Sequence, residues 1–365
     1  MKSLINKVKI SVHVFAVKIL KYSSVGIFSA VFLLHNCSGK QVAKKIHYFE
    51  HVPVICYHHI NPSPLLKDNY INTVPAEFEE QIKFLHSSGY KTILSKDIPV
   101  VLAPAERNIL GNNRKPVLIN FDDGYESVYN YAYPIMKKYG YKGILFIITD
   151  KIENDPTRMY MNKDQISELI KEGWEVGSHT VTHPNLNSIS IDNITEEIAH
   201  SKTVLETMFG VQVISFAYPY GLFNKKLLNL VRDNYKYAYS TILGNNYGFD
   251  DLHLIERYLV LKSHEISNFK MNVISKKLEC RIKSELYNNI LYVDVSLPHE
   301  SKDRTIQVYF NDRLIRDLPA EEKNLQFKFN YYREFNDFSL VMKNDAGEQC
   351  SITKMIHITK SAFVY

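Results

Sequence analysis

Short runs of apolar residues alternate with longer segments of helical periodicity between residues 53 and 233. A continuous apolar run of this length predicts a strand buried on both faces, and regular alternation of such strands with helices indicates a parallel sheet in an α/β domain. Connections of this kind place the carboxyl ends of the strands on one face. The predicted strands are 53–57, 116–121, 144–148, 174–178 and 213–218, and the predicted helices are 75–89, 125–139, 162–171, 191–209 and 224–233.

The pattern changes after about residue 270. Short runs with partial alternation of apolar and polar residues are separated by turn signals such as Asn288-Asn289 and Asn311-Asp312. This spacing predicts a small antiparallel β-sandwich of immunoglobulin-like type. Its predicted strands are 278–286, 290–297, 305–310, 325–329, 338–342 and 351–358.

The first 36 residues differ from the rest of the chain in charge and hydropathy. They hold five lysines and no acidic residue, and they end with an apolar run over 25–34. This run is shorter than the roughly 20 apolar residues that span a bilayer, and it suits the central region of a secretory leader. We therefore expect export, with residues 37–50 as a tether to the first folded domain.

Cys37 follows this run in the sequence Leu33-Leu34-His35-Asn36-Cys37, which resembles a lipoprotein processing site. In such a site the cysteine becomes the lipidated first residue, so we expect a lipid anchor at Cys37 in a membrane of the cell envelope. His35 and Asn36 replace the small residues that are usual there, which leaves simple cleavage or an uncleaved anchor as alternatives. After simple cleavage the protein would be periplasmic or secreted.

The formal net charge of +5 comes from the same leader, because its five lysines account for all of it. The remaining chain is formally neutral, and 45% of all residues are hydrophobic, which is enough for a large core. A neutral protein gives no electrostatic reason to expect a nucleic acid partner.

Two adjacent carboxylates end the predicted strand 116–121, in the sequence Asp122-Asp123-Gly124. Successive side chains of an extended strand point to opposite sides, which allows one carboxylate to bind a metal and the other to act as a base. Gly124 allows the backbone to turn sharply after them. Taken alone, the same three residues also suit an ordinary turn or helix cap.

Two histidines, His179 and His183, follow the predicted strand 174–178. At this spacing both imidazoles can reach one metal ion, and Zn²⁺ accepts nitrogen ligands together with a carboxylate oxygen. Taken alone, such a pair is more often structural. Combined with one aspartate of the first motif, it supplies three protein ligands and leaves positions for water and substrate, which is typical of a catalytic site.

Two further motifs follow later strands. In Tyr218-Pro219-Tyr220-Gly221 the proline stiffens the turn, so that the N–H of Tyr220 can stabilise an oxyanion, although such residues are also common in loop packing. The sequence Leu261-Lys262-Ser263-His264 ends in a residue whose pKa suits an acid that protonates a leaving amine. A single histidine after a short strand is nevertheless usually structural.

These motifs, in this order, resemble the motif series of the polysaccharide deacetylases, carbohydrate esterase family 4, also called the NodB homology domain. The resemblance covers about residues 50–265, and its first two motifs together are highly specific. Residues 54–60 and the helix at 75–89 are similar to the branch of the poly-β-1,6-N-acetylglucosamine deacetylases. The family implies a distorted (β/α)7 barrel, a divalent metal, often zinc, and hydrolytic removal of acetyl groups from N-acetylated sugars.

The resemblance implies a role for each matching position. It implies Asp122 as the catalytic base, the N–H of Tyr220 as part of the oxyanion site, and His264 as the general acid. It also implies a divalent metal, expected to be Zn²⁺, with the ligands Asp123, His179 and His183.

The chain departs from the family pattern at two positions. Many members have an arginine where this chain has Ala217, so the partner that orients the base is missing there. Arg257, near the last motif, is a candidate substitute for it. Asn120 stands in place of the more usual threonine. Neither change removes a metal ligand, so we expect activity.

The expected function is metal-dependent N-deacetylation of an extracytoplasmic polysaccharide that contains N-acetylglucosamine units. The alternative is a carbohydrate-binding or structural surface lipoprotein on a catalytically degenerate scaffold. Cys56 is expected in the core, and Cys280 and Cys350 could form a disulfide in an exported protein. The expected segments are a leader (1–36), a tether (37–50), a deacetylase domain (51–268) and a sandwich (272–365).

Overall fold

The computed structural model describes most of the two predicted folded regions. The leader, the tether with Cys37, and His264 lie outside the described residues, and so does the side chain of Cys350. Within the described ranges, no helix is both long and apolar enough to cross a membrane. These ranges are 51–63, 69–102, 110, 114–244, 246, 251–262, 266–277, 280–287, 290–297, 304–310, 313–319, 324–330, 335–344 and 349–357.

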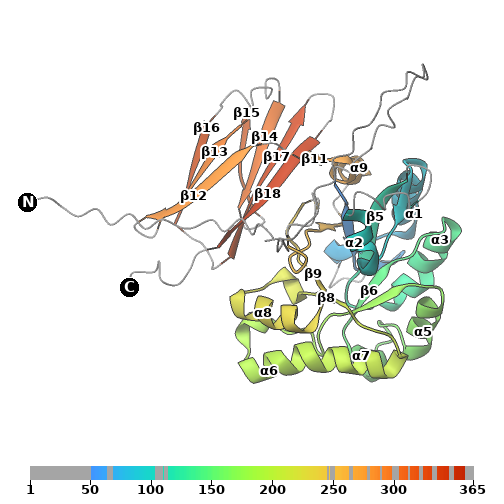
Figure 1. Cartoon of the computed structure of the whole chain (residues 1–365). Coiled ribbons are helices and arrows are strands. Elements are labelled where there is room, and N and C mark those ends of the chain that lie inside the picture. The colour runs from blue at the N-terminus through green and yellow to red at the C-terminus, as the bar shows by residue number, and fades with distance from the viewer. Residues whose placement is uncertain are drawn as a thin grey trace, which may run out of the picture.

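A curled parallel sheet forms the centre of the first domain (Figure 1). Its strand order is β10-β1-β5-β6-β7-β8-β9, and β4 also pairs with β5. The strands are β1 (Val54–Tyr57), β4 (Tyr90–Thr92), β5 (Lys115–Phe121), β6 (Ile144–Ile147), β7 (Glu175–Ser178), β8 (Ser215–Ala217), β9 (Tyr237–Tyr239) and β10 (Tyr258–Leu259). A separate pair is formed by β2 (His59–Ile60) and β3 (Asn72–Thr73).

A short segment closes the curl of this sheet. Ile255 bridges in parallel to Tyr239 of β9, and Tyr258 of β10 pairs with Ile55 of β1. Residues 255–259, which include β10, therefore link β9 at one end of the row with β1 near the other end. This arrangement confirms the expected distorted (β/α)7 barrel. The barrel closes between β9 and Ile255 through a single bridge rather than through a full ladder of hydrogen bonds.

Packing on two sides explains why the strands are almost continuously apolar. Val117 and Ile119 of β5 pack in a cluster with residues of the surrounding helices, whereas Leu118 belongs to a different cluster, which includes residues of β6, β8 and β9. Successive side chains of a strand point to opposite sides. The side chains of Asn120 and Asp122 therefore point to the same side as that of Leu118, which is the inside of the barrel.

Helices cover the outside of the barrel (Figure 1). The helix α5 begins at a capping box, because Asn162 accepts from the N–H of Gln165 and the Gln165 side chain accepts from the N–H of Asn162. The helices are α1 (Pro75–Ser87), α2 (Ile98–Leu102), α3 (Tyr133–Lys138), α4 (Lys151–Asn154), α5 (Lys163–Lys171), α6 (Ile191–Thr195), α7 (Ser201–Phe209), α8 (Lys225–Asn234) and α9 (Ile266–Ile274).

Two predicted helices, 125–139 and 191–209, each contain a π-helical turn. Val128–Ala132 form this wider turn directly before α3, where Pro134 lacks the N–H that a regular helix would use. Glu196–His200 form a second π turn, between α6 and α7. Proline accounts for the first interruption, and the second contains Glu197, whose side chain reaches the candidate site.

Two small sheets form the C-terminal domain, as predicted. One has the order β12-β13-β16 and the other the order β11-β18-β17-β14-β15; every pair is antiparallel except β11 with β18. The strands are β11 (Lys276–Lys277), β12 (Arg281–Tyr287), β13 (Ile290–Ser296), β14 (Arg304–Phe310), β15 (Arg313–Pro319), β16 (Asn324–Phe329), β17 (Phe335–Asn344) and β18 (Gln349–His357).

One shared core joins these two sheets into a sandwich. Val293 and Phe327 of the three-stranded sheet lie in the same buried cluster as Val308 and Leu340 of the five-stranded sheet. Strand β15 was missed from sequence because it lies at the edge of its sheet and most of its side chains are exposed. Its ladder with β14, rather than burial, stabilises it.

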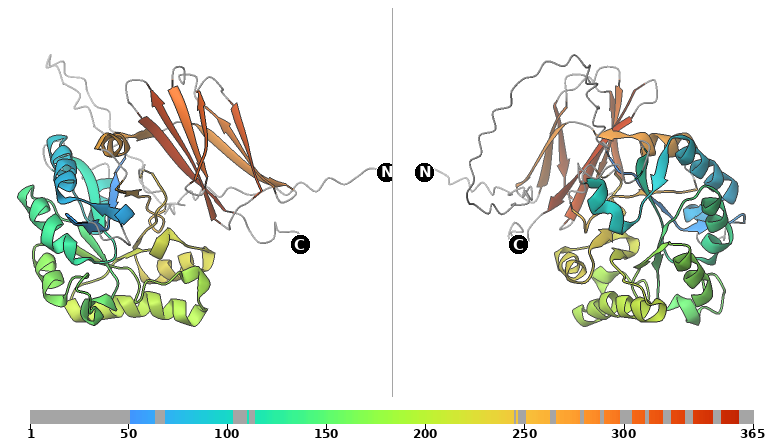
Figure 2. Two further views of the ribbon diagram at one scale, coloured as in Figure 1. Left: turned by 180° about the vertical axis from the view of Figure 1, so that it is seen from behind. Right: turned by 45° about the vertical axis from the view of Figure 1, so that its right-hand side comes forward.

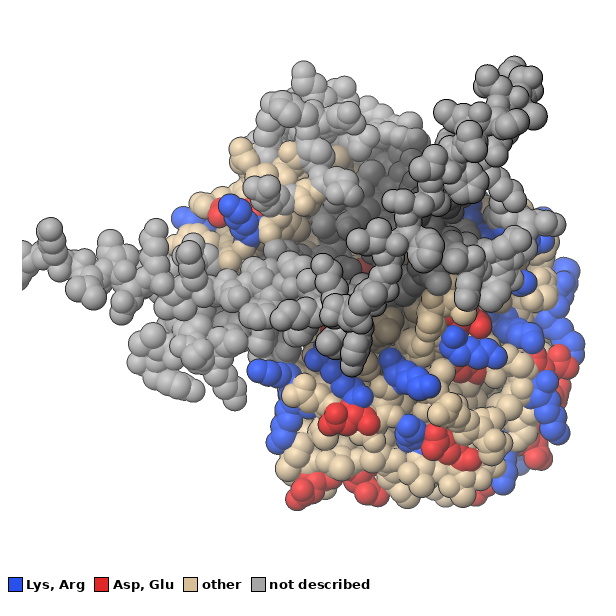
Figure 3. Space-filling view, in the orientation of Figure 1, with Lys and Arg blue, Asp and Glu red and all other residues tan. Residues whose placement is uncertain are grey.

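The sandwich lies beside the barrel, with helix α9 at the junction (Figures 1 and 2). This helix packs against α1 of the barrel and also contacts β18 of the sandwich. Basic and acidic side chains are mixed over the visible face of the barrel, without a large area of one sign (Figure 3).

Candidate metal centre and active site

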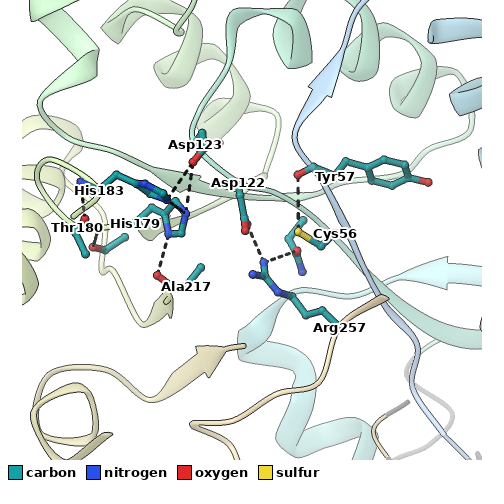
Figure 4. A network of polar contacts seen from close by, with 11 residues as sticks. Cys56, Tyr57, Asp122, Asp123, His179, Thr180, His183, Ala217 and Arg257 are labelled. Carbon is teal, nitrogen blue, oxygen red and sulfur yellow. Dashed lines mark hydrogen bonds and ion pairs between the residues drawn. The ribbon is translucent and has the colours of Figure 1, made fainter. Parts of the chain in front are cut away.

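Asp123, His179 and His183 converge at the carboxyl ends of β5 and β7 (Figure 4). The two histidine Nε2 atoms lie 3.1 Å apart. The Oδ1 atom of Asp123 lies 3.5 Å from Nε2 of His179 and 3.6 Å from Nε2 of His183. The structure thus brings together the three residues that the sequence predicted as metal ligands.

These three distances fit a single metal ion. A tetrahedral site with bonds of about 2.0–2.1 Å separates its ligand atoms by about 3.3 Å. In addition, two neutral imidazoles that face each other with their lone pairs repel, and a cation between them removes this repulsion. The donor set of one carboxylate oxygen and two imidazole nitrogens suits a divalent metal.

A hydrogen bond and burial hold the His179 imidazole in the neutral form that binds a metal. Its Nδ1–H donates to the backbone carbonyl of Ala217 at 2.8 Å, which leaves the lone pair of Nε2 for a metal. Burial lowers the pKa of His179 to about 3 and also lowers the pKa of His183. Both imidazoles are therefore neutral at physiological pH, as metal ligands must be.

Glu197 fixes the loop between the two histidines. Its Oε2 accepts from the N–H groups of Val181 at 2.8 Å and Thr182 at 2.9 Å, and its Oε1 accepts from the Thr182 hydroxyl at 2.6 Å. The N–H of His183 donates to Oγ1 of Thr180 at 3.0 Å. Sequence reasoning missed Glu197 because it lies 15 positions after Thr182, in the π turn, without a local signal.

Left-handed backbone is concentrated at this site. Four of the five non-glycine residues with positive φ in the described ranges belong to it: Asp123 (70°), Thr180 (69°), His183 (62°) and Tyr220 (59°). This conformation is unfavourable for residues with a Cβ, and most of all for a β-branched residue such as Thr180. It persists only where the surrounding structure enforces it, and it clusters at functional sites.

Glycine is required at two positions near the site, by a positive φ at Gly124 and by the close packing of β7 against β6 and β8 at Gly177. Gly124 has a φ of 82°, as expected for the sharp turn after the carboxylates. A Cβ on Gly177 of β7 would lie 2.5 Å from Cε1 of Phe146 and 2.6 Å from Oγ of Ser215. A larger residue at 177 would therefore displace the strand that carries His179.

Asp122 does not belong to the triad and instead pairs with Arg257 (Figure 4). Nη1 of Arg257 lies 2.8 Å from Oδ1 of Asp122 and 3.1 Å from Oδ1 of Asn120, and Nε donates to the carbonyl of Ser240 at 2.6 Å. Burial would raise the pKa of Asp122, but the guanidinium outweighs it and holds this pKa well below its usual range. Asp122 is therefore ionised at neutral pH, and the proposed replacement by Arg257 agrees with the geometry.

The triad and Asp122 line a cleft of about 1040 Å³. Tyrosines are prominent in its wall, and two of them are largely exposed: Tyr70 at 64% and Tyr220 at 61%. The ring of Tyr220 meets the ring of His183 at a centroid distance of 4.6 Å. Tyr220 thus lies where the sequence placed it, beside the metal ligands, whereas His264 is outside the described residues.

Cys56 lies next to this network but is fully buried in β1. Burial raises the pKa of its thiol well above the ordinary value, so the thiol stays protonated. The expectation that Cys56 is a core residue agrees with this position.

Comparisons with known proteins agree with this geometry. Residues 110–238 match the family model described as polysaccharide deacetylase. The YxkH protein of Bacillus subtilis (strain 168) is 33% identical over 177 residues, which are 48% of this chain and 59% of that protein. The poly-β-1,6-N-acetyl-D-glucosamine N-deacetylase of Staphylococcus aureus (strain MRSA252) is 32% identical over 177 residues, which are 45% of this chain and 59% of that protein. The chain therefore spans less than two thirds of the length of these relatives.

A solved structure shows the same similarity. The deacetylase PplD of Streptococcus pyogenes, in complex with acetate, superposes with a TM-score of 0.54 and 27% sequence identity. The match covers 61% of this chain and 98% of that chain.

Proposed function

Since this chain belongs to the polysaccharide deacetylase family, we propose that it hydrolyses the N-acetyl groups of an extracytoplasmic polysaccharide that contains N-acetylglucosamine units. One observation carries this proposal above all others. A buried, ionised carboxylate, Asp122, lies beside a complete set of metal ligands and is not one of them. A base held next to a metal site in an open cleft is the arrangement that amide hydrolysis requires.

The substrate class is supported by the relatives. The Staphylococcus aureus relative is named for poly-β-1,6-N-acetyl-D-glucosamine, and the Streptococcus pyogenes structure holds acetate, which is the product of a deacetylation. The cleft also exposes tyrosine rings, such as Tyr70 and Tyr220, that suit the apolar faces of sugar rings. We therefore include β-1,6-linked N-acetylglucosamine as the first substrate to test.

The proposed role of Asp122 follows from its position, and the roles of Tyr220 and His264 follow from their motifs. Asp122 accepts a proton from the attacking water, because Arg257 keeps its carboxylate ionised and oriented. The N–H of Tyr220 donates to the oxyanion that forms at the acetamide carbonyl. The motif Leu261-Lys262-Ser263-His264 alone supports His264 as the group that protonates the departing amine.

We propose Zn²⁺ as the ion held by Asp123, His179 and His183, because Zn²⁺ favours this mixture of nitrogen and oxygen ligands. A bound divalent metal would polarise the acetamide carbonyl and lower the pKa of water at the site. The chain contributes the neutral state of both imidazoles and the fixed direction of Nε2 of His179.

Acetate release tests the proposed function directly. The purified protein is incubated with oligomers of β-1,6-linked and β-1,4-linked N-acetylglucosamine and with peptidoglycan, and acetate is measured enzymatically. We expect release from at least one of these glycans, loss of release after chelation, and a decrease of about 10²–10⁴-fold for Asp122→Asn. Glycan binding without acetate from any substrate would instead indicate the carbohydrate-binding function.

We also propose that the protein is exported and anchored to the cell envelope by a lipid on Cys37. The lysine-bearing leader and the short apolar run before Cys37 support this proposal. Mass spectrometry of the mature N-terminus tests it: a diacylated cysteine is expected, and an unmodified residue other than Cys37 would contradict it.

A further inference from the structure

The C-terminal sandwich contributes a wall to the cleft that holds the metal centre. Gln307 and Tyr309 of β14 and Ser339 and Val341 of β17 line the same cleft as Asp122 and the triad. None of these four residues belongs to a sequence motif of the deacetylase domain, and we name them the sandwich patch.

The sandwich patch is a continuous area in the middle of one sheet. Gln307 lies directly opposite Val341, and Tyr309 lies directly opposite Ser339 in the antiparallel register of β14 and β17. These two strands are neighbours, with β18 on one side and β15 on the other. The patch therefore occupies the centre of the five-stranded sheet rather than its edge.

Strand alternation explains why these side chains point away from the sandwich core. The residues between and beside them fill that core and are buried: Ile306, Val308, Phe310, Phe338, Leu340 and Met342. Because successive side chains alternate between the two faces, the sandwich patch lies on the opposite face of the sheet. On that face it meets the cleft of the barrel.

Burial shows that the sandwich patch is partly enclosed. Ser339 is only 4% exposed and Val341 only 6%, although both point away from the sandwich core. Gln307 and Tyr309 are half-buried, and the hydroxyl of Tyr309 donates to Oε1 of Gln307 at 3.3 Å. Burial raises the pKa of Tyr309, so its hydroxyl remains a hydrogen-bond donor at neutral pH.

We propose that the sandwich patch binds a sugar unit of the glycan next to the unit that is deacetylated. This inference rests on the proposed function and extends it from one acetamide to a chain. A tyrosine ring beside an amide and a hydroxyl matches an N-acetylhexosamine, which has an apolar ring face, hydroxyl groups and an acetamide. A cleft of about 1040 Å³ is at the upper end of the range for ligand sites, so it has room for more than one sugar.

The proposal makes the sandwich a determinant of specificity for chain length. If this is so, a single sugar at the metal centre does not touch the sandwich patch, whereas an oligomer contacts both. Removal of the Tyr309 ring should therefore weaken binding of a hexamer more than binding of the single sugar N-acetylglucosamine.

Tyr309→Ala and Gln307→Ala are the variants that test this inference, and the same domain offers a matched control for each. Tyr292 of β13 and Gln326 of β16 lie on the outer face of the three-stranded sheet, on the other side of the sandwich. Tyr292→Ala and Gln326→Ala thus remove the same side chains from the same domain without changing the cleft. Circular dichroism compares the folding of all four variants with that of the full-length wild type.

Calorimetric titration measures the affinity of each variant for the single sugar N-acetylglucosamine and for a hexamer of β-1,6-linked N-acetylglucosamine. The metal-free protein is used, so that the oligomers are not consumed. For the hexamer we expect Kd to rise about fivefold to tenfold in Tyr309→Ala and to remain unchanged in both controls. Equal Kd values for the hexamer in Tyr309→Ala, Gln307→Ala and the wild type would overturn the inference.

Two outcomes separate this inference from the proposed function. If the wild type binds the hexamer but releases no acetate, the proposed function fails while the comparison of Kd values still decides the role of the sandwich patch. If acetate is released and the two patch variants behave like their controls, only the inference about the patch is wrong. A wild type that does not bind the hexamer also overturns it.

Discussion

Nη1 of Arg257 lies 2.8 Å from Oδ1 of Asp122, although the two residues are 135 positions apart in the sequence. The same nitrogen donates to Asn120, so the two departures from the family pattern, Asn120 and Ala217, belong to one arrangement. Ala217 is fully buried, and its carbonyl holds His179. The partner of the base comes instead from the segment that closes the barrel.

Replacement of Arg257 by alanine should strongly destabilise the protein. It would leave the buried carboxylate of Asp122 without a partner, and the loss of one member of a buried ion pair costs about 3–5 kcal/mol. Urea denaturation of the metal-free protein measures this free energy. The control is Arg232→Ala, which breaks the partly exposed pair with Asp251 and should cost less than about 1 kcal/mol. Equal costs for the two variants would contradict the role of Arg257.

Arg257→Lys separates charge from geometry. Lysine keeps the positive charge, but one ammonium group cannot replace the fork that reaches Asp122, Asn120 and the carbonyl of Ser240 together. We expect stability between that of the wild type and that of Arg257→Ala, with kcat for acetate release at least about tenfold below the wild type. A wild-type kcat would show that charge alone is sufficient.

Glu197→Ala should weaken metal binding without removing a ligand. The loop 180–183 would lose three hydrogen bonds that hold it in place, and loss of such support typically lowers metal affinity by about 10–100-fold. Competition with a chromogenic chelator measures the affinity. Glu196→Ala removes the adjacent, exposed carboxylate and serves as the control. The explanation is wrong if both variants bind the metal as tightly as the wild type.

Glu175→Gln should change how stability depends on pH. Burial raises the pKa of Glu175 by more than the hydrogen bonds donated by Ser215 and Ser95 lower it. The folded protein therefore keeps this proton to a higher pH than the unfolded chain. This group contributes stability that is fully present below its ordinary pKa and is lost as the pH rises through the raised value.

Urea denaturation at several pH values, from below the ordinary pKa of glutamate to above neutrality, measures this effect. Glutamine imitates the protonated carboxyl group, so the variant should lose less stability than the wild type as the pH rises. Parallel stability curves for the two proteins would rule out this contribution of Glu175.

The fold and the candidate ligands could be predicted because they depend on local patterns. Apolar runs mark the strands, and parallel connections bring their carboxyl ends to one face, so Asp123, His179 and His183 were expected to meet. The contact of Arg257 with Asp122 could only be guessed, because it arises where residues 255–259 close the barrel. Nothing local in the sequence indicates such a closure.

Other features depend on packing that a sequence pattern does not contain. The left-handed backbone of Thr180 and His183 is imposed by the loop around them and not by residue type. The side chain of Glu197 reaches this loop from a π turn that no helical periodicity predicts. In the sequence, Tyr309 cannot be distinguished from other outward-facing residues of a half-buried strand. Its place in the cleft depends on the position of the sandwich beside the barrel.

The central claim is that Asp123 binds the metal while the adjacent Asp122 does not. Metal affinity tests this claim most directly. Zn²⁺ binding is measured by calorimetry for the wild type, Asp122→Asn and Asp123→Asn, with circular dichroism to confirm folding. The account predicts one Zn²⁺ per chain for Asp122→Asn, with nearly wild-type affinity, and a decrease of more than about a hundredfold for Asp123→Asn. Equal weakening in both variants, or weakening in Asp122→Asn alone, would contradict it.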